Sequence, residues 1–276
     1  QTPAEAAADG LVDALVPDRA ELLQAGINSL MEQKRRLFPA AKNAAGFTGP
    51  VAGAPGSAAP RKALDALARI AGVPFEEASA IESRCFAECA TSHEAQALIG
   101  LGFFDRNLLR RSGATLHPAI ERIGHLLAAA LEAERLAIRQ EGITDGMLAH
   151  AAAAQGYELS NSLQDADASH DGADVSGFGE RLVFAQAVAA LRVLAEDESL
   201  PAVAFNVGSV EKGGFPRRSG GVLRFVAHMG AEAFVSRAGA LADRHGDAFA
   251  QPFEAEGLAR RLRAAELADR KMGNSG

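Results

Sequence analysis

The sequence has very few aromatic side chains. Tryptophan is absent, tyrosine occurs once, and aromatic residues make up only 5% of the 276 positions. Hydrophobic residues still account for 48% of the chain, and alanine supplies much of that fraction. Because alanine favours helix and lets helices approach closely, the composition predicts a mainly α fold. The length allows one large domain or about two ordinary ones.

An excess of basic residues is also missing. Lys and Arg number 28 against 35 Asp and Glu, which gives a formal charge of -7. Nucleic-acid binding needs clustered cations that replace counterions on the phosphate backbone. We therefore expect no nucleic-acid partner.

Long apolar runs are absent as well. No stretch approaches the ~18 consecutive apolar residues of a membrane span, and the first residues show no basic segment followed by an apolar one. These absences predict a cytoplasmic protein without a membrane span.

Only two cysteines are present, Cys85 and Cys89. At a spacing of four they share one face of a helix, which suits core packing better than a disulfide framework. A metal site with His93 is the alternative, but no second ligand cluster has zinc-site spacing. The interpretation as packed small residues is favoured.

Helix signals dominate the first half of the chain. Thr2, Pro3 and Glu5 form a capping pattern, and Asp18 is placed to cap a helix over 19–38. Further helices are predicted over 60–72, 75–90, from Ser92 onward, over 117–142 and over 145–155. The helix over 19–38 is expected to carry one apolar stripe of Leu22, Leu23, Ile27, Leu30 and Met31. The helix over 117–142 is expected to turn Glu132 and Glu134 to solvent and to bury Ile120, Ile123, Leu127, Leu131, Leu136 and Ile138. The apolar run 11–16 is too short for a stable helix and predicts an extended segment.

Two stretches interrupt this pattern. The Gly- and Pro-rich segment 46–59 predicts a linker, and the polar segment 160–177 predicts a mobile surface loop. After the loop, a strongly apolar helix is expected from about Phe178. The run AVAFNV at 202–207 fits either a strand or a helix, and 231–245 and 254–271 indicate surface helices.

Residues 213–221 predict a turn-rich loop, which opens the segment GGFPRRSGGVLRF, 213–225. Pro216 fixes the backbone, and Gly220 and Gly221 allow conformations or close approaches barred to other residues. This segment is similar to the Phe-Pro-x-x-Arg-Gly-Gly-Pro-x-x-Tyr loop near the C-terminus of the 3-hydroxyacyl-CoA dehydrogenase part of fatty-acid β-oxidation multifunctional enzymes. Ser219 stands where that family usually has Arg, Val222 where it has Pro, and Phe225 where it has Tyr, so the family's polar contacts there are not carried over.

Two further segments resemble the same bifunctional enoyl-CoA hydratase/3-hydroxyacyl-CoA dehydrogenase family. Residues 60–111 look like the helical connector between its two enzymatic parts, and 1–23 are similar to the end of a crotonase core. The resemblance implies a mainly α helical bundle like the dehydrogenase C-terminal domain, with a short crotonase-tail-like segment at the N-terminus.

The resemblance also implies a division of the chain. We expect a crotonase-tail-like segment over 1–46, a linker over 47–59 and a helical connector over 60–112. The two helical halves of the dehydrogenase-like region are expected over 113–159 and 178–276, on either side of a flexible loop over 160–177.

Neither catalytic core of that family is recognisable in the sequence. No segment matches the hydratase's oxyanion-hole loop with its paired glutamates. The stretch RSGATLHPAIERIGH, 111–125, contains no strand followed by the GxGxxG fingerprint of a dinucleotide site. No catalytic residue is therefore assigned, and whether the chain is an enzyme stays open.

The function implied by the resemblance is a part in fatty-acid β-oxidation, acting on acyl-CoA. In the family this means 2-enoyl-CoA hydration and NAD-dependent 3-hydroxyacyl-CoA oxidation. The partners implied are acyl-CoA and a second copy or a thiolase-type subunit, and NAD is the family's cofactor. The alternative is a non-catalytic helical scaffold or dimerisation module. The candidate substrate or interface loop consists of Phe215, Pro216, Arg217, Arg218, Ser219, Gly220 and Gly221.

Two other groups of polar side chains have spacings that suit ligand binding. His117, Glu121 and His125 recur at four-residue intervals on one helix face, but without a fourth ligand a solvated polar stripe is favoured over a metal site. Arg217, Arg218 and Arg224 offer guanidinium forks to CoA phosphates. A solvated or interface-pairing role is favoured for them, because paired surface arginines are common and no Gly-rich phosphate cradle accompanies them.

Overall fold

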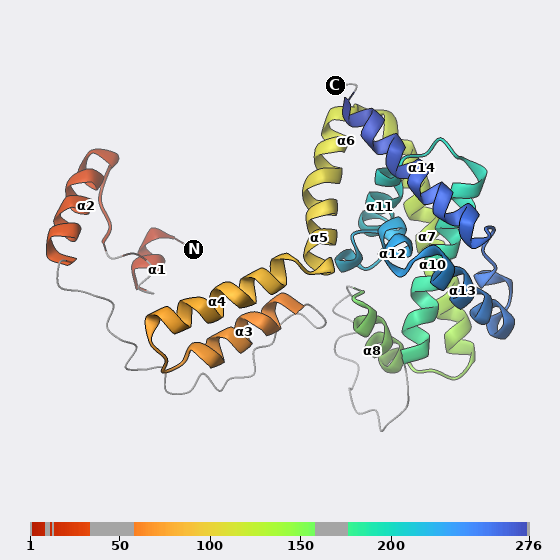
Figure 1. The fold of residues 1–276 in the computed structure, drawn as a ribbon, viewed down its shortest axis with the longest axis horizontal. Helices are drawn as coiled ribbons and strands as arrows, with labels where there is room; N and C mark the ends of the chain where they lie inside the picture. Colours follow the sequence, from red (N-terminus) through yellow and green to blue (C-terminus); the bar gives the residue numbers. More distant parts are fainter. Residues whose placement is uncertain (1, 9–11, 13, 34–57, 158–175, 275–276) are drawn as a thin grey trace.

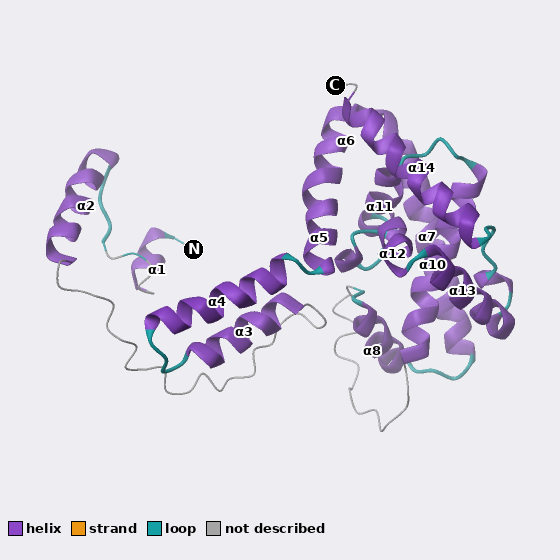
Figure 2. Ribbon diagram, viewed as in Figure 1, coloured by secondary structure: helices purple, strands orange, loops and turns teal. Residues whose placement is uncertain are grey.

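The computed structural model describes residues 2–8, 12, 14–33, 58–157 and 176–274. The described residues form helices joined by short loops and contain no strand (Figure 2). The prediction of a mainly α fold is confirmed. None of the helices in these ranges is long and apolar enough to cross a membrane.

The first two helices begin at the caps that the sequence indicates. In α1 (Pro3–Ala8), the Thr2 amide donates to the Glu5 carboxylate at 2.6 Å and the Glu5 amide donates to the Thr2 hydroxyl at 3.3 Å. In α2 (Arg19–Gln33), the Asp18 carboxylate accepts from the Ala20 amide at 2.8 Å. The predicted end of this helix at 38 lies outside the described residues, as do parts of the predicted extended segment 11–16, whose remaining residues form neither helix nor strand.

An arm of two antiparallel helices follows (Figure 1). It consists of α3 (Ala58–Ile70) and α4 (Phe75–Ala90), which pack against each other. Gly72 ends α3 with φ of 81°, as expected for a residue beyond a helix C-terminus. The start of α3 at Ala58 corrects the predicted linker, whose last two positions are helical.

Beyond the arm, a nearly continuous helical run lies along one side of the molecule (Figure 1). Ser92 caps α5 (His93–Ile99), with its hydroxyl accepting from the Ala95 amide at 3.2 Å. A π-helical turn, η1 (Gly100–Asp105), leads to α6 (Arg106–Ser112) and the short 3₁₀ turn η2 (Gly113–Leu116).

Two helices then precede the undescribed segment 158–175. They are α7 (His117–Gln140) and α8 (Asp145–Gln155), with Thr144 capping α8 and Gly156 ending it at φ of 87°. The bounds of α8 confirm the prediction, and α7 ends two residues before the predicted 142. Two side chains on α7 were wrongly predicted. Leu136 is 56% exposed and not part of the buried face. Glu134 was expected in solvent and is buried, because Arg181 from another helix pairs with it.

The remaining helices complete the body around α10 (Ser176–Glu196), which packs against α7, α8, α12 and α13. The start of α10 at Ser176 corrects the predicted loop over 160–177. The ambiguous run 202–207 belongs to the helix α11 (Ala202–Glu211). The helix α12 (Val222–Met229) was not predicted, while α13 (Ala231–His245) and α14 (Ala255–Asn274) lie where helices were expected. The short 3₁₀ turn η3 (Arg217–Ser219) lies between α11 and α12, and η4 (Asp247–Phe249) lies between α13 and α14.

The core is formed by helices that precede residues 158–175 in the sequence and by helices that follow them. Fully buried side chains of α7, such as Ile123 and Leu127, belong to the same apolar cluster as Leu191 of α10 and Phe205 of α11. Both α13 and α14 contribute to it through Phe234 and Leu258, so these helices are half-buried and not purely surface helices.

Candidate functional site

The loop 213–221 is held in place by two buried polar side chains of α11. The Ser209 hydroxyl accepts from the Val222 amide at 3.0 Å and donates to the Asn206 carbonyl. The Asn206 carboxamide oxygen accepts from the Leu223 and Arg224 amides at 3.1 and 3.2 Å. Because these amides belong to the first turn of α12, one helix caps the next and fixes where the loop ends.

A buried glutamine fixes the start of the same loop. Gln186 of α10 is 0% exposed, and its amide donates to the Gly213 carbonyl at 2.6 Å and to the Leu127 carbonyl at 3.0 Å. The Tyr157 hydroxyl donates to the side-chain oxygen of Gln186 at 2.8 Å, and burial raises the pKa of Tyr157. No buried side-chain nitrogen or oxygen of this network lacks a hydrogen-bond partner, so the network adds rigidity without leaving such a group unsatisfied.

The two adjacent glycines of the loop allow its backbone to touch two helices. Gly220 has φ of 75° and Gly221 has φ of 108°. A Cβ atom on Gly220 would lie 2.8 Å from the Ala97 carbonyl oxygen, and one on Gly221 would lie 2.4 Å from the Asn206 Cα. The glycine pair therefore serves both purposes expected from the sequence, positive φ and close approach.

An ion pair joins the same region to the π-helical turn. The Arg224 guanidinium contacts both carboxylate oxygens of Asp105 at 2.7 Å and donates to the Gly220 carbonyl at 2.9 Å. Burial raises the pKa of the Asp105 carboxyl, and the pairing with Arg224 opposes that shift. Arg224 is thus an internal cross-link between α12 and η1, and its charge is paired within the chain.

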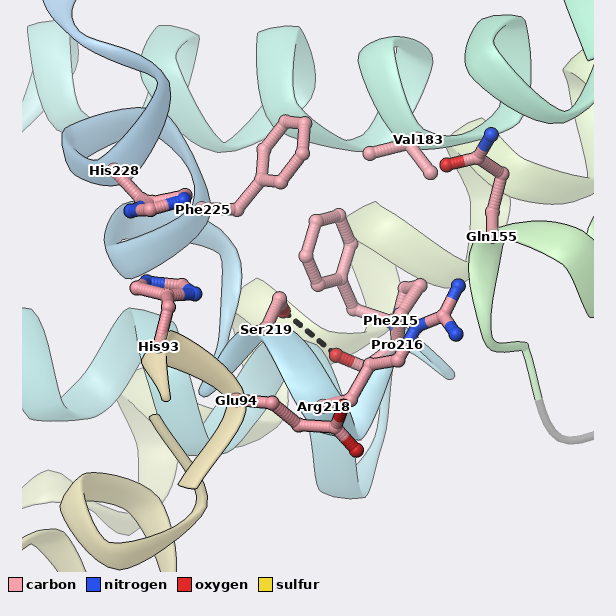
Figure 3. A pocket seen from close by; sticks show the side chains of 10 residues that line it. All are labelled: His93, Glu94, Gln155, Val183, Phe215, Pro216, Arg218, Ser219, Phe225 and His228. Atoms are coloured by element: carbon pink, nitrogen blue, oxygen red, sulfur yellow. Dashed lines mark hydrogen bonds between the residues drawn. The ribbon is translucent and has the colours of Figure 1, made fainter. Parts of the chain in front are cut away.

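A pocket of about 290 Å³ opens beside this loop (Figure 3). The rings of Phe215 and Phe225 face its centre, with Val183 of α10 beyond them. The stacked imidazoles of His93 and His228 lie at one end, and Gln155 and Arg218 lie at the other (Figure 3). The complete lining is His93, Glu94, Gln155, Val183, Phe215, Pro216, Arg218, Ser219, Phe225 and His228.

The polar side chains around the pocket already make internal contacts. The Ser219 hydroxyl donates to the Pro216 carbonyl at 2.6 Å and accepts from the Gly221 amide at 3.3 Å. Arg218 donates to the Ala154 carbonyl. His93 and His228 stack with ring centroids 3.3 Å apart, and desolvation together with the charge of His228 lowers the pKa of His93. No nucleophile with an adjacent general base is found among these described contacts.

The structure therefore divides the candidate loop residues into three groups. Phe215, Pro216, Arg218 and Ser219 line the pocket, Gly220 and Gly221 pack against α5 and α11, and Arg217 is exposed to solvent. The other pocket residues were not identified from the sequence as a site. They come from α5, α8, α10 and α12, and no local pattern marks side chains that only the fold brings together.

The metal alternatives are not supported by the geometry. Cys85 is buried beside Arg69, and Cys89 is partly buried. Glu121 bonds the Lys212 ammonium at 2.8 Å, which lowers its pKa, while its two flanking histidines lie 3.8 and 3.9 Å away. Within the described ranges, no group of three or more His, Cys, Asp or Glu side chains is arranged to hold a metal ion.

The described residues after α6 do not form a dinucleotide site of the Rossmann type. Such a site needs a strand that leads through a Gly-rich turn into a helix. Residues 111–125, where the resemblance would place the fingerprint, form the end of α6, η2 and the start of α7.

Comparison of the chain with protein-family models, with curated proteins and with solved structures finds no match.

Proposed function

We propose that this chain is a helical part of a fatty-acid β-oxidation multifunctional protein and binds acyl-CoA thioesters in the Phe215 pocket. The observation that carries the proposal is the position of the loop through which the sequence resembles that family. Four of its residues form one side of the pocket, between α5, α8, α10 and α12. Enoyl-CoA hydration and NAD-dependent oxidation are assigned to other parts of such a protein, since no residue here matches their motifs.

The chemistry of the pocket suits an acyl thioester. Phe215, Phe225 and Val183 offer an apolar surface for the acyl chain, and burying apolar area is the main favourable term for such a ligand. Arg218 lines the pocket, and the exposed Arg217 is its neighbour in the chain. Guanidinium groups match phosphate oxygens, so this side of the pocket suits the CoA portion.

Calorimetric titration of the purified chain with hexanoyl-CoA and with free CoA tests this proposal. We expect hexanoyl-CoA to bind more tightly than CoA, and the substitution Arg218→Ala to weaken binding by about tenfold, as for loss of one charge-assisted hydrogen bond. Arg263→Ala is the matched control, because Arg263 is exposed on α14, away from the pocket. Failure of both ligands to bind would contradict the proposal.

A second candidate function is a non-catalytic scaffold that pairs with another copy of the chain. Large apolar side chains are exposed on the arm and the π-helical turn, with Phe75 at 79%, Phe86 at 73%, Phe103 at 61% and Phe104 at 63%. Residues 75 and 86 lie on the same side of α4, since eleven residues make slightly more than three whole turns. Exposed aromatic surface of this kind is typical of protein interfaces.

Light scattering during size-exclusion chromatography separates the two candidates. The scaffold function predicts a dimer that Phe86→Asp dissociates, whereas Leu126→Asp, at a side chain 43% exposed on α7, leaves it intact. NADH consumption with acetoacetyl-CoA by the wild-type chain would rule out a purely structural role. A monomer at all concentrations would rule out the dimer.

A further inference from the structure

Two histidines from different helices meet face to face at one end of the Phe215 pocket (Figure 3). His93 is the first residue of α5, and His228 lies in the last turn of α12. Their ring centroids are 3.3 Å apart, and the ring planes are inclined by 21°. Rings at this distance are in van der Waals contact, so no water molecule lies between them to screen a charge on one from a charge on the other.

The stacked pair accommodates one proton more easily than two. A single positive charge is attracted to the face of a neighbouring aromatic ring, whereas two positive charges at this distance repel each other. A cation is favoured in the last turn of a helix, where His228 lies, and disfavoured at the first residue of a helical run, where His93 lies. Desolvation and then the charge of His228 lower the pKa of His93 from its ordinary value of 6.5. His228 therefore takes up the first proton, and His93 takes up the second at a lower pH.

The surrounding charges leave this repulsion in place. Among the described residues, the other charged side chains that line the pocket are Glu94 and Arg218, one of each sign. Arg224, on the same helix as His228, is paired with Asp105 of η1. The helices α4, α10, α11, α13 and α14 also pack against α5 or α12 but contribute no charged side chain to the lining. The charge of the pair thus depends mainly on the two imidazoles themselves.

The histidine stack joins two elements that form opposite parts of the pocket. Apart from this contact, α5 packs mainly against η1, η3 and α4. Both rings are also exposed to solvent, so protons reach them without any change of the fold. Separation of the rings would move the first turn of α5 away from α12 and widen this end of the pocket.

We propose that the His93–His228 stack is a pH-dependent switch of the Phe215 pocket, closed while the pair carries at most one proton and open when it carries two. The inference rests on the proposed function and adds the regulation of that site. With the CoA portion at the Arg218 end, the acyl chain runs across Phe215 and Phe225 toward the histidines (Figure 3). An apolar chain that covers the pair removes it from water, which costs more when the pair is charged. Both effects weaken binding as the pH falls.

The sign and size of the effect follow from proton linkage. The open state binds one proton more than the closed state, so acid favours the open state. Affinity for an acyl thioester should therefore fall by up to about tenfold for each pH unit below the pKa of the second protonation, and it should be constant above that pKa.

The first experiment needs no ligand. Proton NMR follows the imidazole Cε1–H signals of the full chain between pH 8 and 5, in the wild type, His228→Gln and His125→Gln. In the wild type, His93 should titrate below its ordinary value of 6.5, and His228→Gln should raise the pKa of His93 toward that value. His125 is the matched control, because its exposed side chain on α7 lies beside Glu121 and does not line the pocket.

The second experiment is calorimetric titration of the same three chains with hexanoyl-CoA at pH 7.5, 6.5 and 5.5. The wild type and His125→Gln should lose affinity by pH 5.5, whereas His228→Gln, which cannot carry two charges in the stack, should lose clearly less. Phosphate groups of the ligand also titrate near pH 6, but their contribution is the same for all three chains. Circular dichroism at each pH verifies that the helical content stays constant.

These results together support the inference. An affinity that is unchanged or higher at pH 5.5 in the wild type overturns it, as does an equal fall in His228→Gln or a fall that accompanies loss of helical content. An unchanged pKa of His93 in His228→Gln overturns it as well, and all these outcomes leave the proposed function standing. Absence of binding at every pH overturns the proposed function and the regulation of the site with it, even where NMR shows that the two histidines titrate as a coupled pair.

Discussion

Glu134 shows how a neighbour from a distant part of the chain decides the state of one side chain. Its carboxylate contacts the Arg181 guanidinium at 2.6 Å, and both side chains are 5% exposed. Arg181 also contacts Glu141 at 2.7 Å. Burial raises the pKa of Glu134, and the charge of Arg181 opposes that effect. The pair is therefore tolerated in the core only while both partners are present.

Removing one partner should be costly. We expect Glu134→Ala to lower the free energy of unfolding by about 3–5 kcal/mol, since it leaves Arg181 buried with one carboxylate fewer. Glu132→Ala is the control: its side chain is 64% exposed and pairs with Arg135 at the surface, so a change within about 0.5 kcal/mol is expected. Urea denaturation measures both, and equal effects of the two substitutions would contradict the burial argument.

Asp269 offers a test through pH. Its carboxylate accepts from the Val203 amide at 3.0 Å in the first turn of α11. Desolvation raises the pKa of Asp269 from 3.8 to about 6, and the hydrogen bond from Val203 opposes this. Between pH 6 and 4 the folded chain thus binds more protons than the unfolded chain, so this residue makes the protein more stable as the pH falls through that range.

Asp269→Asn keeps the acceptor for the Val203 amide and removes the charge. At pH 7 the variant should be more stable than the wild type by about 1 kcal/mol, a figure reduced for partial exposure of the group. The difference should disappear near pH 4, where the wild-type carboxyl is protonated as well. Denaturant titrations at both pH values check this, and a variant less stable at pH 7 would show that the charge is favourable at the helix start.

At the scale of elements, the joint between the loop 213–221, α5 and α11 depends on backbone approach. Gly221→Ala should destabilise the protein by about 2–5 kcal/mol, because it combines φ of 108° with a Cβ placed 2.4 Å from the Asn206 Cα. Gly102→Ala in η1 meets no atom within 4 Å and should be neutral or stabilising by up to about 1 kcal/mol. Thermal unfolding followed by circular dichroism distinguishes them; a tolerated Gly221→Ala would mean that the loop can move away from α11.

The elements that could be predicted from sequence are those with local start and stop signals. The bounds of α8 follow from Thr144 and Gly156, and those of α4 from the turn at Gly72 and the polar residues after Ala90. The helix α12 was missed because its cap, Asn206, belongs to another helix. An apolar pattern gives the direction in which a side chain points, but not the partner it meets there.

The same limit explains why the pocket was only partly predicted. The loop 215–219 was recognised from its glycines, proline and family resemblance. The other lining residues, from His93 to His228, come from four separate helices and follow no motif. Their meeting depends on how α5 packs against η3 and how α12 follows α11, which are properties of tertiary packing and not of any short segment.

At the scale of the whole molecule, apolar burial is unevenly distributed. The main core cluster begins at Leu101, whereas α1 has no buried residue. The predicted apolar stripe of α2 is exposed, with Leu22 at 59%, Leu23 at 74% and Ile27 at 45%. Since hydrophobic burial supplies most of the stabilising free energy, the first two helices contribute little to the stability of the body.

Two truncations test this distribution. A chain comprising 58–276 should keep the melting temperature of the full chain, because no described contact of the core is lost. A chain comprising 113–276 should melt at a clearly lower temperature, because it loses Leu101 from the core and leaves Arg224 without Asp105. Loss of a partner from such a pair is costly, since it leaves a partly buried charge uncompensated.

Differential scanning calorimetry compares the three chains. A large drop already in 58–276 would mean that α1 and α2 make stabilising contacts with the body, and equal melting of all three would mean that the run from α5 to α6 is not part of the cooperative core.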